Sequence, residues 1–268
     1  MEIGITTGSF WPKSTLEAIN ILSSFDISGI EVTLQTNEFS LDFDRNVGLS
    51  LFRKIKNQVL KSKMKIISVH APHFLDEQSF SNEAKEKILN KSIEVCSLLG
   101  GSVFVFHPVH IFKTYEDAQK FILKQKPLEE VLLDKFRNIL SRMYDLKIIP
   151  TLENIRTFST EKFFNDPDNM GYFLKEISSP AFGITLDLVH SQLAGNTQEF
   201  IKKLGYKIVH IHVADVDENK RRVPPGSGVI DWPSLLVSIQ KTSASNLVLE
   251  LIAAKQIEIS SALEILNI

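Results

Sequence analysis

The feature that most constrains the fold is a regular alternation of two kinds of segment along the chain. Short β-branched runs recur, and between them lie longer segments in which apolar residues repeat at helical spacing. Eight runs have this strand-like character: 2–6, 29–34, 65–70, 102–107, 147–153, 183–187, 207–212 and 246–251. Apolar strands that alternate with helices predict a parallel sheet whose two faces are both covered.

The number of strand–helix units decides between two parallel-sheet architectures. Eight units in 268 residues are typical of an α/β fold of the single (β/α)₈ TIM-barrel type, so we expect residues 1–268 to form one such domain. An open, doubly wound sheet would need a glycine-rich nucleotide turn after an early strand. The stretch TTGSFWP (6–12) lacks that pattern, and LLGGSVF (98–104) precedes a strand instead of following one.

Several segments carry clear helical signals. The best examples are 14–25, 82–100 and 127–146. The pair Gly100-Gly101 is a stop signal for the second helix, and Pro127 stands where the third is expected to begin. We interpret the basic stretch KIKNQVLKSKMK (54–65) as the solvated side of another amphipathic helix.

The charge balance limits the classes of partner. Lys and Arg number 30 against 32 Asp and Glu, which gives a formal net charge of −2. A protein that binds nucleic acid usually shows a basic excess, so the composition argues against such a partner. No apolar run reaches the length of a membrane-spanning helix, which argues against a membrane protein. The sequence leaves a homo-oligomer open.

Cysteine content and the N-terminal residues predict a cytoplasmic location. Cys96 is the single cysteine, so no internal disulfide can form, and a reducing compartment fits. It lies in the helical pattern KSIEVCSLLG (91–100), where we expect a small core residue. The N-terminal stretch MEIGITTGSF has an acidic second residue and no apolar signal core, so nothing indicates export.

Ionisable residues stand at the ends of seven of the eight predicted strands. In a barrel of parallel strands these ends meet at one rim, which is where active sites of this fold lie. The residues are Glu31, His70, His107, Glu153, Asp187, His212 and Glu250. Nitrogen and oxygen ligands that converge from several strands are what a divalent metal needs, and without a cation the carboxylates would repel one another. The pattern therefore predicts a metal site at this rim.

Each residue taken alone has a simpler interpretation. A carboxylate after a strand is often a helix N-cap, and Glu31 fits a pocket residue and a cap equally well. His210 lies two residues before His212, on the same side of its strand, and is expected to be a satisfied core histidine. His73 and His110 lie beyond strand ends and fit loop residues or substrate contacts. All seven histidines nevertheless fall at or just beyond strand ends, which favours a shared site.

Seven short motifs, in this order and at these strand positions, resemble the xylose-isomerase-like barrels. They are VHAPH (69–73), FHP (106–108), LEN (152–154), LDLVHSQLAG (186–195), HIHVADV (210–216), PPGSGVIDW (224–232) and LVLEL (247–251). That superfamily includes sugar isomerases and epimerases, hydroxypyruvate isomerase and endonuclease IV. The similarity extends over nearly the whole chain and is specific to the superfamily, not to one member.

The resemblance implies a ligand set and a reaction. The four protein ligands of one divalent metal would be Glu153, Asp187, His212 and Glu250, with Mn²⁺ or Zn²⁺ expected and Co²⁺ or Mg²⁺ as alternatives. Glu153 and Glu250 would also act as the acid/base pair of a sugar, sugar-phosphate or hydroxy-carbonyl isomerase or epimerase. The metal would act as a Lewis acid that stabilises an enediolate while the carboxylates move the proton.

The same resemblance implies substrate contacts. His190 would hydrogen-bond a substrate oxygen, and Arg222 is the best candidate for an anion or hydroxyl contact, followed by Arg221. Trp11, with Phe10, is expected to form an apolar wall or lid, and a core role fits these two residues equally well. Several ketose 3-epimerases carry a further glutamate where this chain has Ser159, with Arg156 or Glu161 as substitutes, so a free ketohexose is not the assured substrate.

Two alternative functions follow from the same motifs. An endonuclease IV-like zinc phosphodiesterase acting on abasic DNA would use His70 and His107, with Glu153 bridging, as a further metal site. Its third zinc site needs His190 and an Asp-x-His, and Lys220 and Arg222 occupy the positions of that pair here, which argues against abasic-site cleavage. The family's GEG is GSG, with Ser227 in place of the acid. The remaining alternative is a non-catalytic metal- or sugar-binding barrel.

Overall fold

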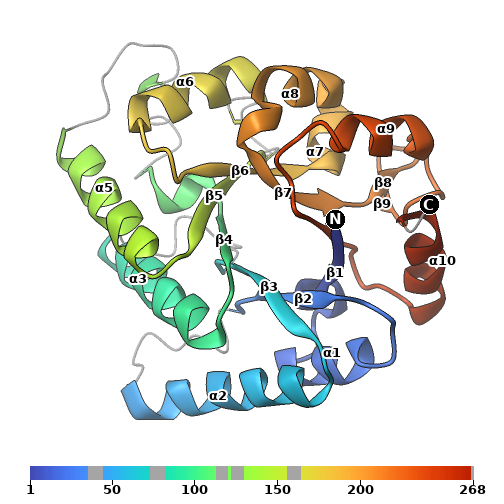
Figure 1. Cartoon of the computed structure of the whole chain (residues 1–268), viewed down its shortest axis with the longest axis horizontal. Coiled ribbons are helices and arrows are strands. Elements are labelled where there is room, and N and C mark those ends of the chain that lie inside the picture. The colour runs from blue at the N-terminus through green and yellow to red at the C-terminus, as the bar shows by residue number, and fades with distance from the viewer. Residues whose placement is uncertain (36–44, 73–81, 113–119, 122–129, 156–163, 267–268) are drawn as a thin grey trace.

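The predicted TIM barrel is confirmed. The computed structural model describes residues 1–35, 45–72, 82–112, 120–121, 130–155 and 164–266. Within these residues, parallel strands close into one barrel in the order β1-β10-β7-β6-β5-β4-β3-β2 (Figure 1). The barrel strands are β1 (Glu2–Thr6), β2 (Gly29–Thr33), β3 (Lys65–His70), β4 (Val103–Phe106), β5 (Ile149–Glu153), β6 (Gly183–Asp187), β7 (Ile208–Val213) and β10 (Asn246–Leu249).

Helices surround the barrel in Figure 1 and cover its outer face. They are α1 (Thr15–Leu22), α2 (Arg45–Lys61), α3 (Asn82–Leu99), α5 (Glu130–Asp145), α6 (Pro167–Ile177), α7 (Leu188–Ala194), α8 (Thr197–Leu204), α9 (Trp232–Ile239) and α10 (Gln256–Leu266). Short 3₁₀ turns are η1 (Thr7–Phe10), η2 (Pro108–His110) and η3 (Gly205–Lys207). The strands are largely buried between the helices and the barrel interior, which explains why most of their residues are apolar, with polar exceptions such as Glu31, His70 and His212.

The predicted helices form, with ends shifted by local capping. Helix α1 begins after Ser14, which forms a capping box with Glu17, and it ends at Leu22, three residues before the predicted end. Helix α3 ends at Leu99, and Gly100 follows it with a φ of +85°. The third predicted helix corresponds to α5, which ends at Asp145, while Pro127 lies outside the described residues.

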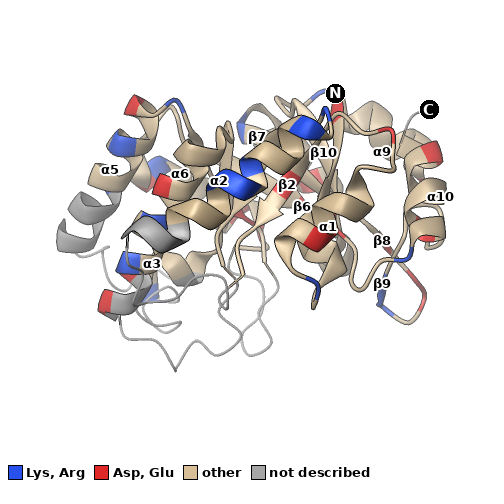
Figure 2. Ribbon diagram, turned by 90° about the horizontal axis from the view of Figure 1, so that it is seen from below, with Lys and Arg blue, Asp and Glu red and all other residues tan. Residues whose placement is uncertain are grey.

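The basic stretch 54–65 contains more than a helix. Helix α2 ends at Lys61, a turn with Lys63 at a φ of 58° follows, and Lys65 already begins β3. The helical part is amphipathic as predicted, because Ile55 and Val59 are buried while Lys54 is exposed. Among the described helices, α2 carries Lys and Arg without acidic residues and α10 carries Glu without basic residues, whereas α5 and α6 carry both signs (Figure 2). None of the described helices is long and apolar enough to cross a membrane.

Close strand contact at the start of β2 requires glycine. A Cβ atom on Gly29 would lie 2.5 Å from the carbonyl oxygen of Lys65 and 2.9 Å from Cγ1 of Ile67. Neither contact is tolerated, and the first involves backbone that cannot move without breaking the β2–β3 pairing. Gly29 therefore allows the close β2–β3 pairing at Lys65, and a register shift after Ile30 then places Glu31 beside Ser68.

A small antiparallel ribbon follows β7 and returns the chain toward the barrel mouth. It pairs β8 (Asp215–Val216) with β9 (Arg222–Val223). The turn between the two strands is held by Asp217, which accepts hydrogen bonds from the backbone N–H of Asn219 and of Arg221 at 2.9 Å. Because the ribbon folds back on itself, Arg222 lies near the ends of barrel strands that are distant in the sequence.

Asp215 anchors the segment that follows the ribbon. Its buried carboxylate accepts bonds from the backbone N–H groups of Gly226 and Ile230 at 3.0 and 3.1 Å and from Trp232 Nε1 at 2.8 Å. Gly228 passes so close that a Cβ atom there would lie 2.3 Å from Asp215 Oδ1. The motif PPGSGVIDW is thus wrapped around one carboxylate, and this arrangement fixes where the ribbon leaves the barrel.

Candidate metal-binding active site

Four of the predicted metal ligands converge at the carboxyl ends of neighbouring barrel strands. Glu153 and Asp187 are the last residues of β5 and β6, His212 lies near the end of β7, and Glu250 directly follows β10. One side-chain oxygen or nitrogen from each residue lies within 4.8 Å of those of the other three. Glu153, Asp187 and His212 are buried, and the Glu250 side chain keeps 18% of its surface exposed. We refer to Glu153, Asp187, His212 and Glu250 as the ligand quartet.

His70 and His107 hold one oxygen of Glu153. Each histidine places its Nε2 atom 3.1 Å from Glu153 Oε2. The two rings meet edge to face with their centroids 4.9 Å apart. These three side chains form a second group that could bind a metal ion, and it shares Glu153 with the ligand quartet.

His212 lies between two sets of carboxylates. Its Nδ1 atom is 3.5 Å from Glu153 Oε2 and 3.5 Å from Glu250 Oε2. Its Nε2 atom is 3.3 Å from Glu31 Oε2 on the other side. Burial alone would lower the pKa of His212, but attraction by Glu31 and Glu153 outweighs it and raises the pKa well above its ordinary value.

Asp187 also makes structural hydrogen bonds in addition to its place in the quartet. Its Oδ1 atom accepts the backbone N–H of His190 at 2.8 Å and so caps helix α7. Its backbone is clamped by Asn154, whose Oδ1 accepts the Asp187 N–H at 2.6 Å and whose Nδ2 donates to the Asp187 carbonyl at 3.1 Å. The helix-cap and metal-ligand interpretations of this residue are therefore compatible, because the cap uses Oδ1 and leaves Oδ2 toward the site.

Arg222 reaches the quartet from the ribbon and pairs with two of its members. Its Nη2 lies 2.8 Å from Asp187 Oδ2, and its Nη1 lies 2.7 Å from Glu250 Oε2 and 2.9 Å from the Glu250 carbonyl. Burial of Glu250 opposes its ionisation, but the Arg222 charge outweighs that effect and lowers the pKa of Glu250 to about 2. The predicted substrate contact Arg222 is thus also the counter-ion of two candidate ligands.

The donor set fits a divalent cation. A bound ion would take His212 in its neutral form, and the three carboxylates and one guanidinium then carry a net charge of −2, which one divalent ion would neutralise. Mixed carboxylate and imidazole donors suit Mn²⁺, Zn²⁺ and related ions more than soft ions that prefer thiolate. Glu153 would bind as an anion: its burial opposes ionisation, but attraction by His212 and His107 holds its pKa well below the ordinary value.

The remaining predicted contacts lie around the same rim. The Nδ1 atom of His190, on helix α7, is buried and has no hydrogen-bond partner among the described residues. Trp11 follows η1 and is 63% exposed, whereas its neighbour Phe10 is packed in the core. Arg221 points into the ribbon turn, where it pairs with Asp217. His73, Arg156, Ser159 and Glu161 lie outside the described residues.

Two of the residues with open interpretations are buried in the barrel interior. Glu31 is fully buried and does not cap a helix; its Oε2 atom lies 3.1 Å from His210 Nε2. His210 is a core histidine as predicted, but its partner is this carboxylate. In the sequence, the i, i+2 spacing of HIH on strand β7 indicates that His210 and His212 lie near each other, because it places both rings on one side of the strand.

His110 has a structural role. Its Nδ1 accepts the backbone N–H of His107 at 3.1 Å, and its Nε2 lies 3.1 Å from the Pro72 carbonyl. Burial lowers its pKa to about 3, so the ring is neutral and Nε2 carries the proton that it donates to Pro72. His110 therefore joins the 3₁₀ turn after β4 to the segment after β3.

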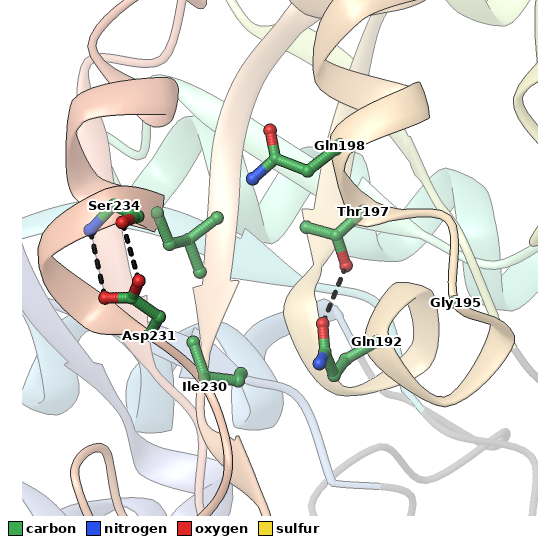
Figure 3. A pocket seen from close by; sticks show the side chains of 8 residues that line it. Gln192, Gly195, Thr197, Gln198, Ile230, Asp231 and Ser234 are labelled. Carbon is green, nitrogen blue, oxygen red and sulfur yellow. Dashed lines mark hydrogen bonds between the residues drawn. The ribbon is translucent and has the colours of Figure 1, made fainter.

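A shallow pocket lies beside this rim but apart from the ligand quartet. Figure 3 shows it between helices α7 and α8 on one side and the start of α9 on the other. Gln192 and Thr197 line one wall, and Ile230, Asp231 and Ser234 line the opposite wall. Asp231 already caps α9 by accepting the backbone N–H of Ser234 at 3.3 Å and also accepts from Ser234 Oγ at 2.6 Å, and Thr197 donates to Gln192. Its polar groups are thus largely engaged with one another.

The fold and the site define a (β/α)₈ barrel with a candidate divalent-metal centre at its rim. The chain belongs to the xylose isomerase-like TIM barrel family, whose profile matches residues 19–265. Among curated relatives, an uncharacterized protein of Methanocaldococcus jannaschii is 23% identical over 253 residues, which span 90% of this chain and 80% of that protein.

Solved structures with the same fold include two of different stated activity. A D-tagatose 3-epimerase-like protein superposes with a TM-score of 0.74 at 20% identity, covering 100% of this chain and 96% of its own. An AP endonuclease of family 2 from Brucella melitensis superposes with a TM-score of 0.73 at 15% identity, covering 98% of both chains. At these identities the likeness establishes the fold.

Proposed function

We propose that the protein is a divalent-metal-dependent isomerase or epimerase of a sugar, a sugar phosphate or a related hydroxy-carbonyl compound. The observation that carries the proposal is the ligand quartet, whose donor atoms lie within 4.8 Å of one another at the ends of β5, β6, β7 and β10. The family of the chain and its structural likeness to an epimerase-like protein support the same class of reaction.

The quartet would hold the ion, and Glu153 and Glu250 would also move the proton. When bound, the ion supplies Lewis-acid polarisation of the substrate carbonyl. One glutamate removes the proton from the carbon next to the carbonyl, which gives an enediolate, and the other returns a proton to a different carbon or to the other face. His70 and His107 fix the orientation of Glu153, and Arg222 fixes that of Glu250, so both bases are held before substrate arrives.

Substrate oxygens would meet the remaining polar groups of the rim. The unpartnered Nδ1 of His190 suits a substrate hydroxyl, since a buried polar atom without a partner is costly until one is supplied. Arg222 already binds two carboxylates and has donors left for a hydroxyl or an anionic group. The exposed indole of Trp11 would cover the apolar side of the substrate.

Two measurements test this function. Metal analysis of purified protein should find about one Mn²⁺, Zn²⁺ or related ion per chain that chelators remove. Ketoses, ketose phosphates and hydroxypyruvate incubated in deuterated water should then show metal-dependent exchange at a carbon next to the carbonyl. A protein that holds no ion under any loading condition would refute the site. Binding of metal and sugar without exchange would indicate the non-catalytic barrel.

An endonuclease IV-like phosphodiesterase is the second candidate, because one specific group favours it. His70, His107 and Glu153 form a second potential metal site beside the quartet, as a multi-zinc enzyme would require. Against it, Arg222 takes the motif position of one ligand of that enzyme's third zinc, and a guanidinium paired with Asp187 and Glu250 would not bind a cation. Incision of duplex DNA at an abasic site, with two or more zinc ions per chain and no carbonyl exchange, would favour this enzyme.

A further inference from the structure

One buried carboxylate behind the quartet has no place in the chemistry above. Glu31 comes from β2, yet its side chain lies at His212 of β7, 181 residues later in the sequence. Its Oε2 atom is the acceptor for three groups: Ser68 Oγ at 2.8 Å, His210 Nε2 at 3.1 Å and His212 Nε2 at 3.3 Å. All four residues are fully buried. Burying a carboxylate costs free energy unless hydrogen-bond donors surround it, and Glu31 has three such donors.

The contact between Glu31 and His212 decides which nitrogen of the ring faces the quartet. An ionised carboxylate only accepts hydrogen bonds, so the Nε2 atom that points at Glu31 must carry a hydrogen. In the neutral ring, Nδ1 then has the free lone pair. Nδ1 is the atom that lies 3.5 Å from both Glu153 and Glu250, and it makes no hydrogen bond within the described residues.

We propose that Glu31 is a positioning residue that fixes the tautomer and orientation of His212, so that Nδ1 is the atom presented to the metal. Ser68 and His210 hold Glu31 in turn, which prevents its carboxylate from rotating away from His212. Metal-bound histidines that donate their second N–H to a carboxylate are stronger and better oriented ligands. The inference rests on the proposed metal site and assigns Glu31 no contact with substrate.

Glu31→Gln tests the role with little change of shape. The amide can turn its NH₂ group toward His212 Nε2, which favours the opposite tautomer with the hydrogen on Nδ1. Zn²⁺ affinity, measured by competition with a chromogenic chelator, should fall about tenfold or more in this variant. Ser68→Ala, which removes one support of Glu31, should weaken binding by a smaller factor. Glu94→Gln, on the outer helix α3 where Glu94 pairs with Lys91, is the control and should bind as the wild type does.

Nitrogen-15 NMR of histidine-labelled, Zn²⁺-loaded wild-type protein supplies a second readout that does not depend on the Glu31 and Ser68 variants. The His212 signals should show a protonated Nε2 and a metal-bound Nδ1, with the assignment made from His212→Asn. Coordination through Nε2, or unchanged Zn²⁺ affinity in Glu31→Gln, would overturn the inference while leaving the metal site intact. A wild-type protein that binds no Zn²⁺ would instead refute the proposed function itself, and the inference with it.

Discussion

Arg222 donates from Nη2 to Asp187 Oδ2 at 2.8 Å, which ties the β8–β9 ribbon to the end of β6. The same guanidinium donates to Glu250 through Nη1, so one cation lies between two members of the ligand quartet. Arg222, which we expect to contact substrate, therefore also neutralises part of the negative charge of the quartet. Removing it should change the stability of the metal-free protein as well as substrate binding.

Arg222→Met should therefore destabilise the metal-free protein by about 3 kcal/mol, because it leaves two largely buried carboxylates without their counter-ion. A divalent ion should restore more of the melting temperature in this variant than in the wild type, since it replaces the lost positive charge. Substrate KM should also rise. Arg221→Met is the matched control: its side chain is 72% exposed, and it should change stability by less than about 1 kcal/mol. Equal metal-free stability of the two variants would contradict the role of Arg222 as the counter-ion of Asp187 and Glu250.

Chelation should destabilise the wild-type protein by an amount that depends on the logarithm of the ratio of free ion to its dissociation constant. An ion present at about 100 times its dissociation constant stabilises the native state by about 2.7 kcal/mol, which thermal melts with and without EDTA can measure. Glu153→Ala should abolish this difference, because Glu153 belongs to the ligand quartet and also to the group with His70 and His107. Glu94→Ala removes two ion pairs on the outer helices, with Lys91 and Arg142, and should preserve the difference. An EDTA effect that survives Glu153→Ala would place the ion elsewhere.

Asp215→Asn should lower the free energy of unfolding by about 2–4 kcal/mol. The amide cannot accept all the hydrogen bonds of the buried carboxylate, and groups such as Trp232 Nε1 and the Gly226 N–H would be left unpaired. Asp231→Asn is the comparison, because Asp231 accepts from Ser234 at the exposed start of α9 and asparagine is also a good N-cap. Urea unfolding should give Asp215→Asn a clearly lower free energy of unfolding than Asp231→Asn. Coincident unfolding curves would contradict the anchoring role.

Cys96 should be inert in the native state. It is fully buried, and burial raises the pKa of its thiol from about 9 to about 12, so almost no thiolate forms near pH 8. A chromogenic disulfide reagent should react with it only at the rate of unfolding. Because the raised pKa favours the protonated native form, this contribution to stability is full below pH 9 and is lost as the pH rises toward 12. Rapid reaction with the folded protein would contradict the burial.

The fold was predictable because the spacing of apolar residues along the sequence identifies the strands and helices. Each barrel strand lies within two residues of a predicted apolar run, and the helices differ mainly at their ends. Those ends depend on capping contacts and turns, such as the Ser14 capping box or the positive φ of Lys63, which periodicity does not reveal. The helical interpretation of 54–65 was incomplete for this reason, because its last residue already belongs to β3.

The candidate ligands were predictable because the barrel topology brings the ends of the strands together. Once Glu153, Asp187, His212 and Glu250 are placed at strand ends, a closed parallel barrel brings them to one rim whatever the loops do. The pairings within that rim were not predictable. They depend on rotamers and on registers such as the shift between Ile30 and Glu31, which pairs Glu31 with Ser68 instead of Ile67.

The sequence by itself therefore determined the barrel and the identity of the residues at its mouth, since strand order and alternation follow from spacing along the chain. Only the tertiary structure decided that Arg222 neutralises Asp187 and Glu250, and that Glu31 holds the far side of His212. The physical reason is that charge pairing and hydrogen bonding act over about 3 Å, between residues that the chain separates by up to 181 positions.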